Sequence, residues 1–332
     1  MSLLRDITED KKLLFFSGKG GVGKTTVAAT CALGASKQGK RTLLVSTDPA
    51  HNLGHLFNHH IGDTITSLTD NLFALELDPE KTATKHLNEV SQVLRRLMPG
   101  QLSGEVDKHM ELAKHAPGLH EAALLERIAE VLETAESYDL IVFDTAPSGH
   151  TARLMALPEL MSTWTDGLLK RRDKSEKLGK LLSGLGRKTE DKQGSNIFGS
   201  ESSSPTAERD EQIRHILHRR KHRFAHLRNA IQDDSQCAFL IVLTLERLPV
   251  MESIELAQQL AATRTPLAGI VINKRIPSEA KGLLAERRKQ ENTYLKELEA
   301  SLGHLPQQVL PLNAQDITGL DALNKLADET CC

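Results

Sequence analysis

The sequence predicts an α/β protein built on a doubly wound, mostly parallel β-sheet. Short apolar runs alternate with helix-length segments, a glycine-rich loop joins the first run to a helix, and polar motifs follow later runs. Alternation of this kind places parallel strands in a sheet that helices cover on both faces. Ligands of such sheets bind at the carboxyl ends of the strands.

The predicted strands are short runs rich in Leu, Ile, Val and Phe, as buried strands are. They are Lys12–Phe16, Thr42–Ser46, Leu72–Leu77, Leu140–Phe143, Ala238–Thr244, Leu267–Ile272 and Gln308–Leu312. Between them, the segments with helical length and pattern are Val27–Ser36, Lys81–Leu97, Leu119–Ala135, Val250–Ala262, Ala280–Leu302 and Gly319–Ala327.

The first predicted strand leads into a loop that fits the pattern G-x-x-x-x-G-K-[ST]. Glycines in this pattern let backbone N–H groups approach phosphate oxygens, and the next helix points its positive end at the anion. Lys24 would neutralise the β- and γ-phosphates, and Thr25 would bind magnesium. The expected nucleotide contacts are Gly18, Lys19, Gly20, Gly21, Val22, Gly23, Lys24, Thr25 and Thr26.

Lys19 is an extra lysine at the second position of this loop. A phosphate-binding loop does not require a lysine there. The residues alone leave two interpretations open. Lys19 is either a solvated loop lysine or a lysine that reaches a second nucleotide across a dimer interface.

Two acidic motifs follow other predicted strands, TDPAHN from Thr47 and DTAPSGHT from Asp144. Asp144 is placed to hold magnesium, directly or through water, and Asp48 to orient or deprotonate an attacking water. The alternatives are a capping Asp after a strand and a turn-forming Asp-Pro pair. Three motifs in order, each after a strand, favour a magnesium-dependent nucleotide hydrolase.

The nucleotide base is predicted to be adenine. Guanine-binding proteins with a phosphate loop carry Asn-Lys-x-Asp, whose carboxylate accepts hydrogen bonds from the base. Here Asn273, Lys274 and Arg275 are followed by Ile276, which has no acceptor. Asn273 is therefore expected to meet the adenine edge with its amide, and ATP is the expected cofactor.

Composition excludes several other classes of protein. The 332 residues include 42 basic and 44 acidic side chains and carry a formal charge of -2, which argues against binding nucleic acid. No apolar run reaches the roughly 20 residues that span a bilayer, and the N-terminus lacks a signal-peptide pattern. With only four cysteines, a cytoplasmic protein is expected.

One region interrupts the alternation of strands and helices. Residues 160–230 contain no convincing strand, and residues 188–207 are rich in Ser, Gly and charge, which predicts a mobile loop. The predicted organisation is a core of residues 1–159 and 231–332 with a helical subdomain over residues 160–230 that meets a client or partner.

An amphipathic helix is expected near the end of this subdomain. Its apolar face contains Phe224, Leu227 and Ile231. Its histidine face is either a metal site or a solvated basic surface, and the neighbouring arginines favour the solvated surface because they would repel a cation. The histidines are His215, His218, His222 and His226.

Several motifs together resemble one known family. GKGGVGKTT, STDPAHN, DTAPSGHTARL, PGLHEA and PLNAQDITGL are similar to motifs of the arsenite-pump ATPase (ArsA) and of its relative, the Get-pathway ATPase that targets tail-anchored membrane proteins. Both belong to the deviant Walker A group of phosphate-loop hydrolases, with MinD and the nitrogenase iron protein. The resemblance runs from about Leu13 to Leu326.

The resemblance implies a homodimer that closes around ATP and magnesium, because only one phosphate loop is present. Lys19 then corresponds to the signature lysine that reaches the partner's nucleotide. Asp48 corresponds to the water-activating residue of switch I, with Asn52 nearby. Switch II, which rearranges when the γ-phosphate leaves, corresponds to Asp144, Thr145, Ala146, Pro147, Ser148, Gly149, His150 and Thr151.

The resemblance also assigns residues from the later strands. Glu246 lies where the family has a Pro-Glu pair near the dimer interface, although the proline is missing here. Asn273 corresponds to the adenine contact, and Pro311 and Leu312 begin the loop to Gln315 that surrounds the base.

Three functions follow from the resemblance. The first is extrusion of arsenite, antimonite or another anion with a membrane pump as partner. The second is ATP-gated targeting of tail-anchored or other hydrophobic segments, for which the apolar stretch from Leu160 to Leu185 would form a groove. A MinD-type spatial ATPase has least support because the tail from Gly319 is not basic. The first two would bring the protein to a membrane surface through its partner.

Cysteine positions bear on the first two functions. The zinc-binding Cys-x-x-Cys pair of the targeting relative is absent between Asn273 and Leu302, and the thiols of the usual metalloid site are absent from their usual places. Cys331 and Cys332 are either a metalloid-binding pair on a flexible tail or ordinary terminal residues. Cys31 and Cys237 are expected to be small buried residues.

Overall fold

The computed structural model describes residues 2–48, 52–78, 80–85, 87–88, 91, 119–146 and 205–331. These residues form an eight-stranded sheet in the order β3-β4-β2-β5-β1-β6-β7-β8. Neighbouring strands are parallel except β3, which runs antiparallel to β4. The predicted doubly wound, mostly parallel sheet is confirmed.

The strands lie within a few residues of their predicted positions. They are β1 (Leu13–Ser17), β2 (Thr42–Ser46), β3 (Thr66–Ser67), β4 (Leu72–Glu76), β5 (Leu140–Asp144), β6 (Cys237–Leu243), β7 (Leu267–Arg275) and β8 (Gln307–Pro311). The edge strand β3 was not predicted, because two residues are too few to show an alternating pattern. β7 continues past its predicted end at Ile272.

Helices follow most strands. They are α1 (Leu3–Asp10), α2 (Lys24–Lys37), α3 (Asn52–Phe57), α6 (Leu119–Glu133), α8 (Pro205–Gln232), α9 (Arg247–Ala262), α10 (Leu283–Leu302) and α11 (Gly319–Thr330). The unpredicted α1 is capped by the Ser2 hydroxyl, which accepts a hydrogen bond from the Arg5 N–H. Of the predicted helix Lys81–Leu97, residues 81–85, 87–88 and 91 are helical, and the others lie outside the described residues.

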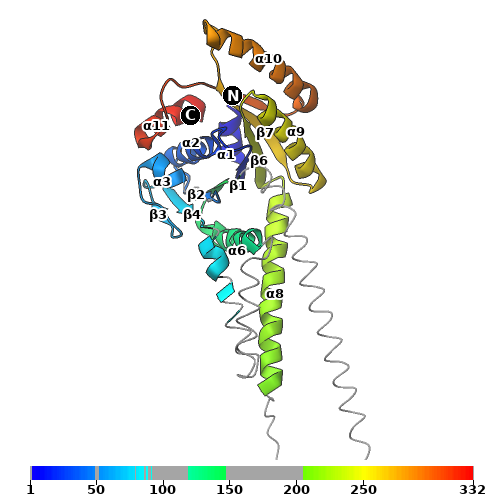
Figure 1. Cartoon of the computed structure of the whole chain (residues 1–332). Helices are drawn as coiled ribbons and strands as arrows, with labels where there is room; N and C mark the ends of the chain where they lie inside the picture. Colours follow the sequence, from blue (N-terminus) through cyan, green and yellow to red (C-terminus); the bar gives the residue numbers. More distant parts are fainter. Residues whose placement is uncertain are drawn as a thin grey trace, which may run out of the picture.

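Helices cover both faces of the sheet (Figure 1). The alternation of side chains along β1 shows which helices pack on which face. Leu13 and Phe15 point to the face packed by α6, α8, α9 and α10. Leu14 and Phe16 point to the face packed by α1, α2, α3 and α11. A continuous apolar run is what a strand buried on both faces requires.

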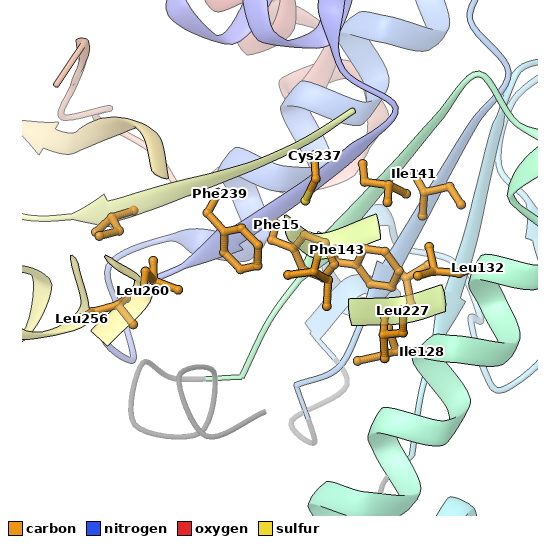
Figure 2. Packing of buried hydrophobic residues seen from close by; sticks show 14 of the residues in the cluster. Phe15, Ile128, Leu132, Ile141, Phe143, Leu227, Cys237, Phe239, Leu256 and Leu260 are labelled. Carbon is orange, nitrogen blue, oxygen red and sulfur yellow. The ribbon is translucent and has the colours of Figure 1, made fainter. Parts of the chain in front are cut away.

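A stack of phenyl rings ties the central strands together. Phe15 of β1 stacks on Phe143 of β5 and on Phe239 of β6, each with ring centroids 4.6 Å apart (Figure 2). All three rings are fully buried, and each contributes about 1.5–3 kcal/mol of burial free energy. The stack packs β1 against both neighbouring strands, and the glycine-rich loop follows β1 at its carboxyl end.

The predicted helical subdomain is only partly described. α8 begins at Pro205 and packs its C-terminal half against α6 and β6. Its long N-terminal part extends away from the sheet (Figure 1). Residues 147–204 lie outside the described residues, so the division at residue 160 and a mobile loop over residues 188–204 stay predictions. Residues 205–207, expected in that loop, instead begin α8, which continues to Gln232, past the predicted division at residue 230.

Candidate active site

The loop between β1 and α2 has a backbone that glycine adopts most readily. Gly18, Gly21 and Gly23 have φ angles of 150, 83 and 93°. A Cβ at Gly18 would lie 2.1 Å from the carbonyl oxygen of Val242, and one at Gly23 would lie 2.4 Å from Nδ2 of Asn273. Close approach of β6 and β7 therefore adds to the conformational reason for glycine at these positions.

The first turn of α2 is arranged to receive an anion. α2 starts at Lys24, and its N-cap residue Gly23 makes no side-chain capping hydrogen bond. The backbone N–H groups of that turn are therefore available to an external acceptor, and the helix dipole favours negative charge there. This end of the helix lies over the central strand, at the carboxyl edge where ligands of such sheets bind.

Lys24 is folded into the loop. Its side chain is buried, and its Nζ donates a hydrogen bond to the carbonyl oxygen of Lys19 at 3.2 Å. Burial lowers the pKa of Lys24, whereas the nearby charges of Asp144 and Asp48 act to raise it. A buried cation between carboxylates is typical of a functional site.

Asp144, the last residue of β5, faces Thr25 across the loop. The Thr25 hydroxyl donates a hydrogen bond to Oδ2 of Asp144 at 2.7 Å. Asp144 is fully buried, and its Oδ1 accepts no hydrogen bond from any residue that the structure describes. The structure thus brings together the two residues that the sequence predicts as magnesium ligands.

The chemistry of this pair fits a divalent cation. Burial raises the pKa of Asp144 to about 7, although the Thr25 hydrogen bond and the Lys24 charge oppose the rise. A cation at Oδ1 would supply the missing interaction and favour the charged carboxylate. Magnesium prefers oxygen ligands such as a carboxylate and a hydroxyl, so these residues fit it.

Asp48 lies close to the same charges. It follows Thr47 after the end of β2, is half-buried, and donates its N–H to Oγ of Ser46 at 3.3 Å. Its charge influences the pKa values of both Lys24 and Asp144. Asn52 begins α3, but its side chain and residues 49–51 lie outside the described residues.

The end of β7 also contacts the loop between β1 and α2. Asn273 donates from Nδ2 to the carbonyl oxygen of Val22 at 2.9 Å. Pro311 and Leu312 are exposed at the end of β8, and the Leu312 N–H donates to the carbonyl of Arg275 at 2.9 Å. The residues predicted to surround the adenine are therefore neighbours, and the adenine contact itself stays a prediction.

Comparison with known protein families shows which family of nucleotide-binding proteins has this sequence. The sequence profile of the anion-transporting ATPases, the ArsA ATPases, matches residues 11–331. The chain belongs to the anion-transporting ATPase family. It is therefore an ATP-hydrolysing enzyme, and the resemblance inferred from its motifs is confirmed.

Curated relatives match nearly the whole chain. The putative arsenical pump-driving ATPase 2 of Aquifex aeolicus is 29% identical over 318 residues, 95% of this chain and 98% of the relative. ATPase ASNA1 homolog 1 of Paramecium tetraurelia is 29% identical over 337 residues, 98% and 94% of the two chains. The arsenical pump-driving ATPase of Escherichia coli is 30% identical over 321 residues, 94% of this chain but only 48% of that protein.

Lys19 of this anion-transporting ATPase makes an ion pair within its own chain. Its Nζ contacts Oε1 of Glu252 on α9. Sequence reasoning missed Glu252, because no local pattern marks a glutamate far along the chain as a neighbour of the loop. Glu246, expected near a dimer interface, is exposed at the N-cap of α9 and pairs with Arg287 at 2.6 Å.

The first residues of the segment predicted as switch II connect three strand ends. The Thr145 hydroxyl donates to the carbonyl of Phe16 at 2.8 Å, and the Ala146 N–H donates to Oγ1 of Thr47 at 3.3 Å. A shift in the position of Asp144 would therefore be transmitted to the ends of both β1 and β2. Pro147, Ser148, Gly149, His150 and Thr151 lie outside the described residues.

Cys331 corrects an expectation, because it is not on a flexible tail. It is fully buried where α11 packs on α2, and its Sγ lies 3.4 Å from the hydroxyl oxygen of Thr330. A hydrogen bond between the thiols raises the pKa of Cys31 and lowers that of Cys331. Cys31 and Cys237 are buried as predicted; Cys332 lies outside the described residues.

The histidine face of α8 is exposed to solvent, at His215, His218, His222 and His226. The opposite face, at Phe224, Leu227 and Ile231, is buried. Arg223 turns toward α6 and donates from Nε to Glu133 at 2.8 Å. Within the described residues, no three His, Cys, Asp or Glu side chains are placed to hold a metal. No described helix is long and apolar enough to cross a bilayer.

Proposed function

We propose that this ATPase hydrolyses magnesium-bound ATP as a homodimer and uses the cycle to drive extrusion of arsenite or another anion through a membrane partner. One observation supports the proposed hydrolysis of magnesium-bound ATP. The Thr25 hydroxyl and the Asp144 carboxylate meet beside the buried ammonium of Lys24, at the N-terminus of α2. Phosphoryl transfer needs these groups in one place.

Each side chain has a distinct part in this proposal. The Lys24 ammonium leaves the Lys19 carbonyl, where it now rests, and contacts the β- and γ-phosphates. Thr25 and Asp144 would hold magnesium, directly or through water, and the ion would supply positive charge to neutralise the phosphates. Asp48 orients the attacking water and accepts its proton. The N–H groups of the loop and of the first turn of α2 bind the remaining phosphate oxygens.

Lys19 is the residue that supports the proposed homodimer. To reach a nucleotide in a partner subunit, Lys19 must leave Glu252, and both side chains are about one-third exposed. An exposed pair of this kind is worth about 0–1 kcal/mol. The polyphosphate of ATP carries several negative charges, so it competes easily with one surface carboxylate for the lysine.

The names of relatives support anion extrusion. The Aquifex and Escherichia relatives are named for driving an arsenical pump, and they match 95% and 94% of this chain. Trivalent arsenic is a soft centre that prefers thiolate ligands. The cysteines of this chain are Cys31, Cys237, Cys331 and Cys332, so any thiol-dependent response must come from these residues.

The test is the rate of phosphate release with and without arsenite or antimonite. We expect magnesium-dependent hydrolysis that either metalloid stimulates, and loss of the stimulation in a Cys331→Ala, Cys332→Ser double variant. Substitution is preferable to truncation because Cys331 is buried against α2. Hydrolysis that neither metalloid alters would exclude arsenite as the transported anion.

The likeness to the Paramecium ASNA1 homolog over 98% of this chain supports a second candidate, an ATP-gated carrier of tail-anchored or other hydrophobic membrane-protein segments. The groove predicted for it, from Leu160 to Leu185, lies outside the described residues. A fluorescent apolar helix peptide distinguishes the candidates. Capture that differs between ATP and ADP supports the carrier, and absence of capture in both states removes it.

A further inference from the structure

β7 ends in an irregularity beside the phosphate loop. Its register against β8 shifts between Ile272 and Arg275, and Lys274 has a φ of 55°. In a regular strand, consecutive side chains point to opposite faces of the sheet. An irregular residue re-aims its side chain, and here both Asn273 and Lys274 reach the same loop.

These two side chains hold two consecutive carbonyl groups of the loop. Nδ2 of Asn273 donates to the carbonyl of Val22 at 2.9 Å, and Nζ of Lys274 donates to the carbonyl of Gly21 at 3.0 Å. Oδ1 of Asn273 also accepts the Lys274 N–H at 2.9 Å, which joins the two residues into one unit. An anion-binding loop needs its N–H groups directed inward, and fixed carbonyls favour that arrangement.

Lys274 has a backbone conformation that residues with a Cβ rarely adopt. A positive φ is uncommon for a residue with a Cβ and persists where neighbours impose it. The next residue supplies such an anchor, because the Arg275 guanidinium pairs with the buried Glu291 at 2.6 Å. The Arg275 carbonyl also accepts the Leu312 N–H. Strain of this kind clusters at functional sites.

We propose that Lys274 is a positioning residue of the nucleotide site. Its ammonium holds the Gly21 carbonyl outward, which presets the loop N–H groups for the phosphates of ATP. The inference rests on the proposed nucleotide site and adds a role that neither Lys19 nor Lys24 fills. Because Lys274 acts through the loop, its removal weakens nucleotide binding more than it slows the chemical step.

The first test compares Lys274→Met with Lys274→Arg. Methionine keeps the apolar stem and removes the donor, whereas arginine restores charge and donor. Binding of a non-hydrolysable ATP analogue, measured by calorimetry on the full chain, should weaken roughly three- to tenfold in Lys274→Met. KM should rise by a similar factor while kcat stays within about twofold, and Lys274→Arg should recover most of the affinity.

A glycine pair separates positioning from stability. Lys274→Gly removes the donor and also relieves the positive φ. Arg264→Gly relieves an equivalent φ of 56° in an exposed turn after α9. Neither variant should melt below the wild type, but only Lys274→Gly should lose affinity for the ATP analogue. A loss of affinity that merely follows a lower melting temperature would contradict the positioning role.

The two proposals fail in different ways. If the wild-type chain does not bind or hydrolyse ATP, the proposed function fails with it. If the wild type does both and Lys274→Met binds the analogue equally well, the nucleotide site stands and the role of Lys274 is wrong.

Discussion

At the scale of single residues, the site is organised around one buried carboxylate. Asp144 meets the Thr25 hydroxyl on one side and the charges of Lys24 and Asp48 on the others. Its Oδ1 is unsatisfied among the described residues. Leaving a buried acceptor without a partner costs about 1–3 kcal/mol, so a bound cation would recover stability here as well as provide chemistry.

Asp48 gives the most direct test of the hydrolytic mechanism. Asp48→Asn keeps the shape of the side chain and removes the proton acceptor. We expect ATP binding close to that of the wild type and kcat reduced by roughly 10²–10⁴-fold. Calorimetry and phosphate-release assays measure the two effects. Asp70→Asn, at an exposed position before β4, is the matched control, and near-normal turnover of Asp48→Asn would exclude its role as the base.

Asp144 makes the stability of the nucleotide-free protein depend on pH. Its pKa rises from 3.8 to about 7 on folding, so the folded protein keeps a proton that the unfolded chain releases between these values. The free energy of unfolding should therefore fall as pH increases from about 4 through about 7, by at most about 4 kcal/mol.

Thermal unfolding in EDTA across this pH range measures the effect. Asp144→Asn cannot titrate, so its melting temperature should fall less with increasing pH than that of the wild type. Parallel curves for the two proteins would show that the pKa of Asp144 is not raised. Magnesium and ATP, added at neutral pH, should raise the melting temperature of the wild type more than they raise that of the variant.

At the scale of elements, the C-terminal helix supports the helix that carries the phosphate loop. α11 packs on α2 through Gly34 and Cys331, and Lys37 pairs with Asp328 at the same contact. Ser2 at the start of α1 also bonds to the carbonyl of Thr330. The position of α2, and with it Lys24 and Thr25, therefore depends on both ends of the chain.

Gly34 tests this packing. A Cβ at Gly34 would lie 2.6 Å from Cβ of Cys331. Alanine would gain about 1 kcal/mol in helix propensity, but overpacking of the contact costs about 1–3 kcal/mol. Gly34→Ala should therefore lower the free energy of unfolding by about 1 kcal/mol, as measured by urea denaturation.

Two further variants make the steric explanation specific. Cys331→Gly removes the opposing Cβ, so the loss caused by Gly34→Ala should shrink in that background. Gly62→Ala, where a new Cβ meets nothing within 4 Å, should leave stability within about 0.5 kcal/mol of the wild type. An equal loss in both backgrounds would show that the Gly34–Cys331 contact is not the cause.

At the scale of the whole molecule, the surface beside the loop has apolar side chains that the proposed dimer would use. Lys19 and Glu252 lie there, and Leu248 and Met251 of α9 are 58% and 45% exposed. Exposed apolar side chains next to a nucleotide site are available for a second subunit. Dimer closure would bury them and release Lys19 from Glu252.

Dependence of activity on protein concentration tests the dimer. The wild-type rate per chain should increase with protein concentration, and Lys19→Gln should lower kcat more than tenfold while ATP still binds. Light scattering with magnesium and ATP, in the slow Asp48→Asn background, should show a dimer that Lys19→Gln weakens. Lys325→Gln on α11 is the matched control; a rate independent of concentration would count against the dimer.

Much of this fold and site follows from local sequence rules. The apolar runs predict the central strands because a buried strand needs no polar face. The glycines from Gly18 to Gly23 predict the loop, because phosphate binding requires N–H groups at close range. Asp48 and Asp144 could be placed at one edge because parallel strands end together.

Local rules were insufficient for other features. α1 and β3 are short, so their patterns do not rise above those of a loop. Cys331 was expected on a flexible tail because terminal residues often lack contacts, yet α11 buries it against α2. Burial of a terminal residue depends on what its helix packs against, which the sequence near it does not reveal.

The sequence by itself determined the chemistry of this protein: a phosphate loop, two acidic strand ends and a doubly wound sheet. Only the tertiary structure decided how these parts are held, with Lys19 on Glu252, Lys274 on Gly21 and Cys331 beside Gly34. The physical reason is the separation along the sequence of the residues that interact. Strands and loops follow from residues next to one another, whereas each of these contacts joins residues that only the strand order and helix packing bring together.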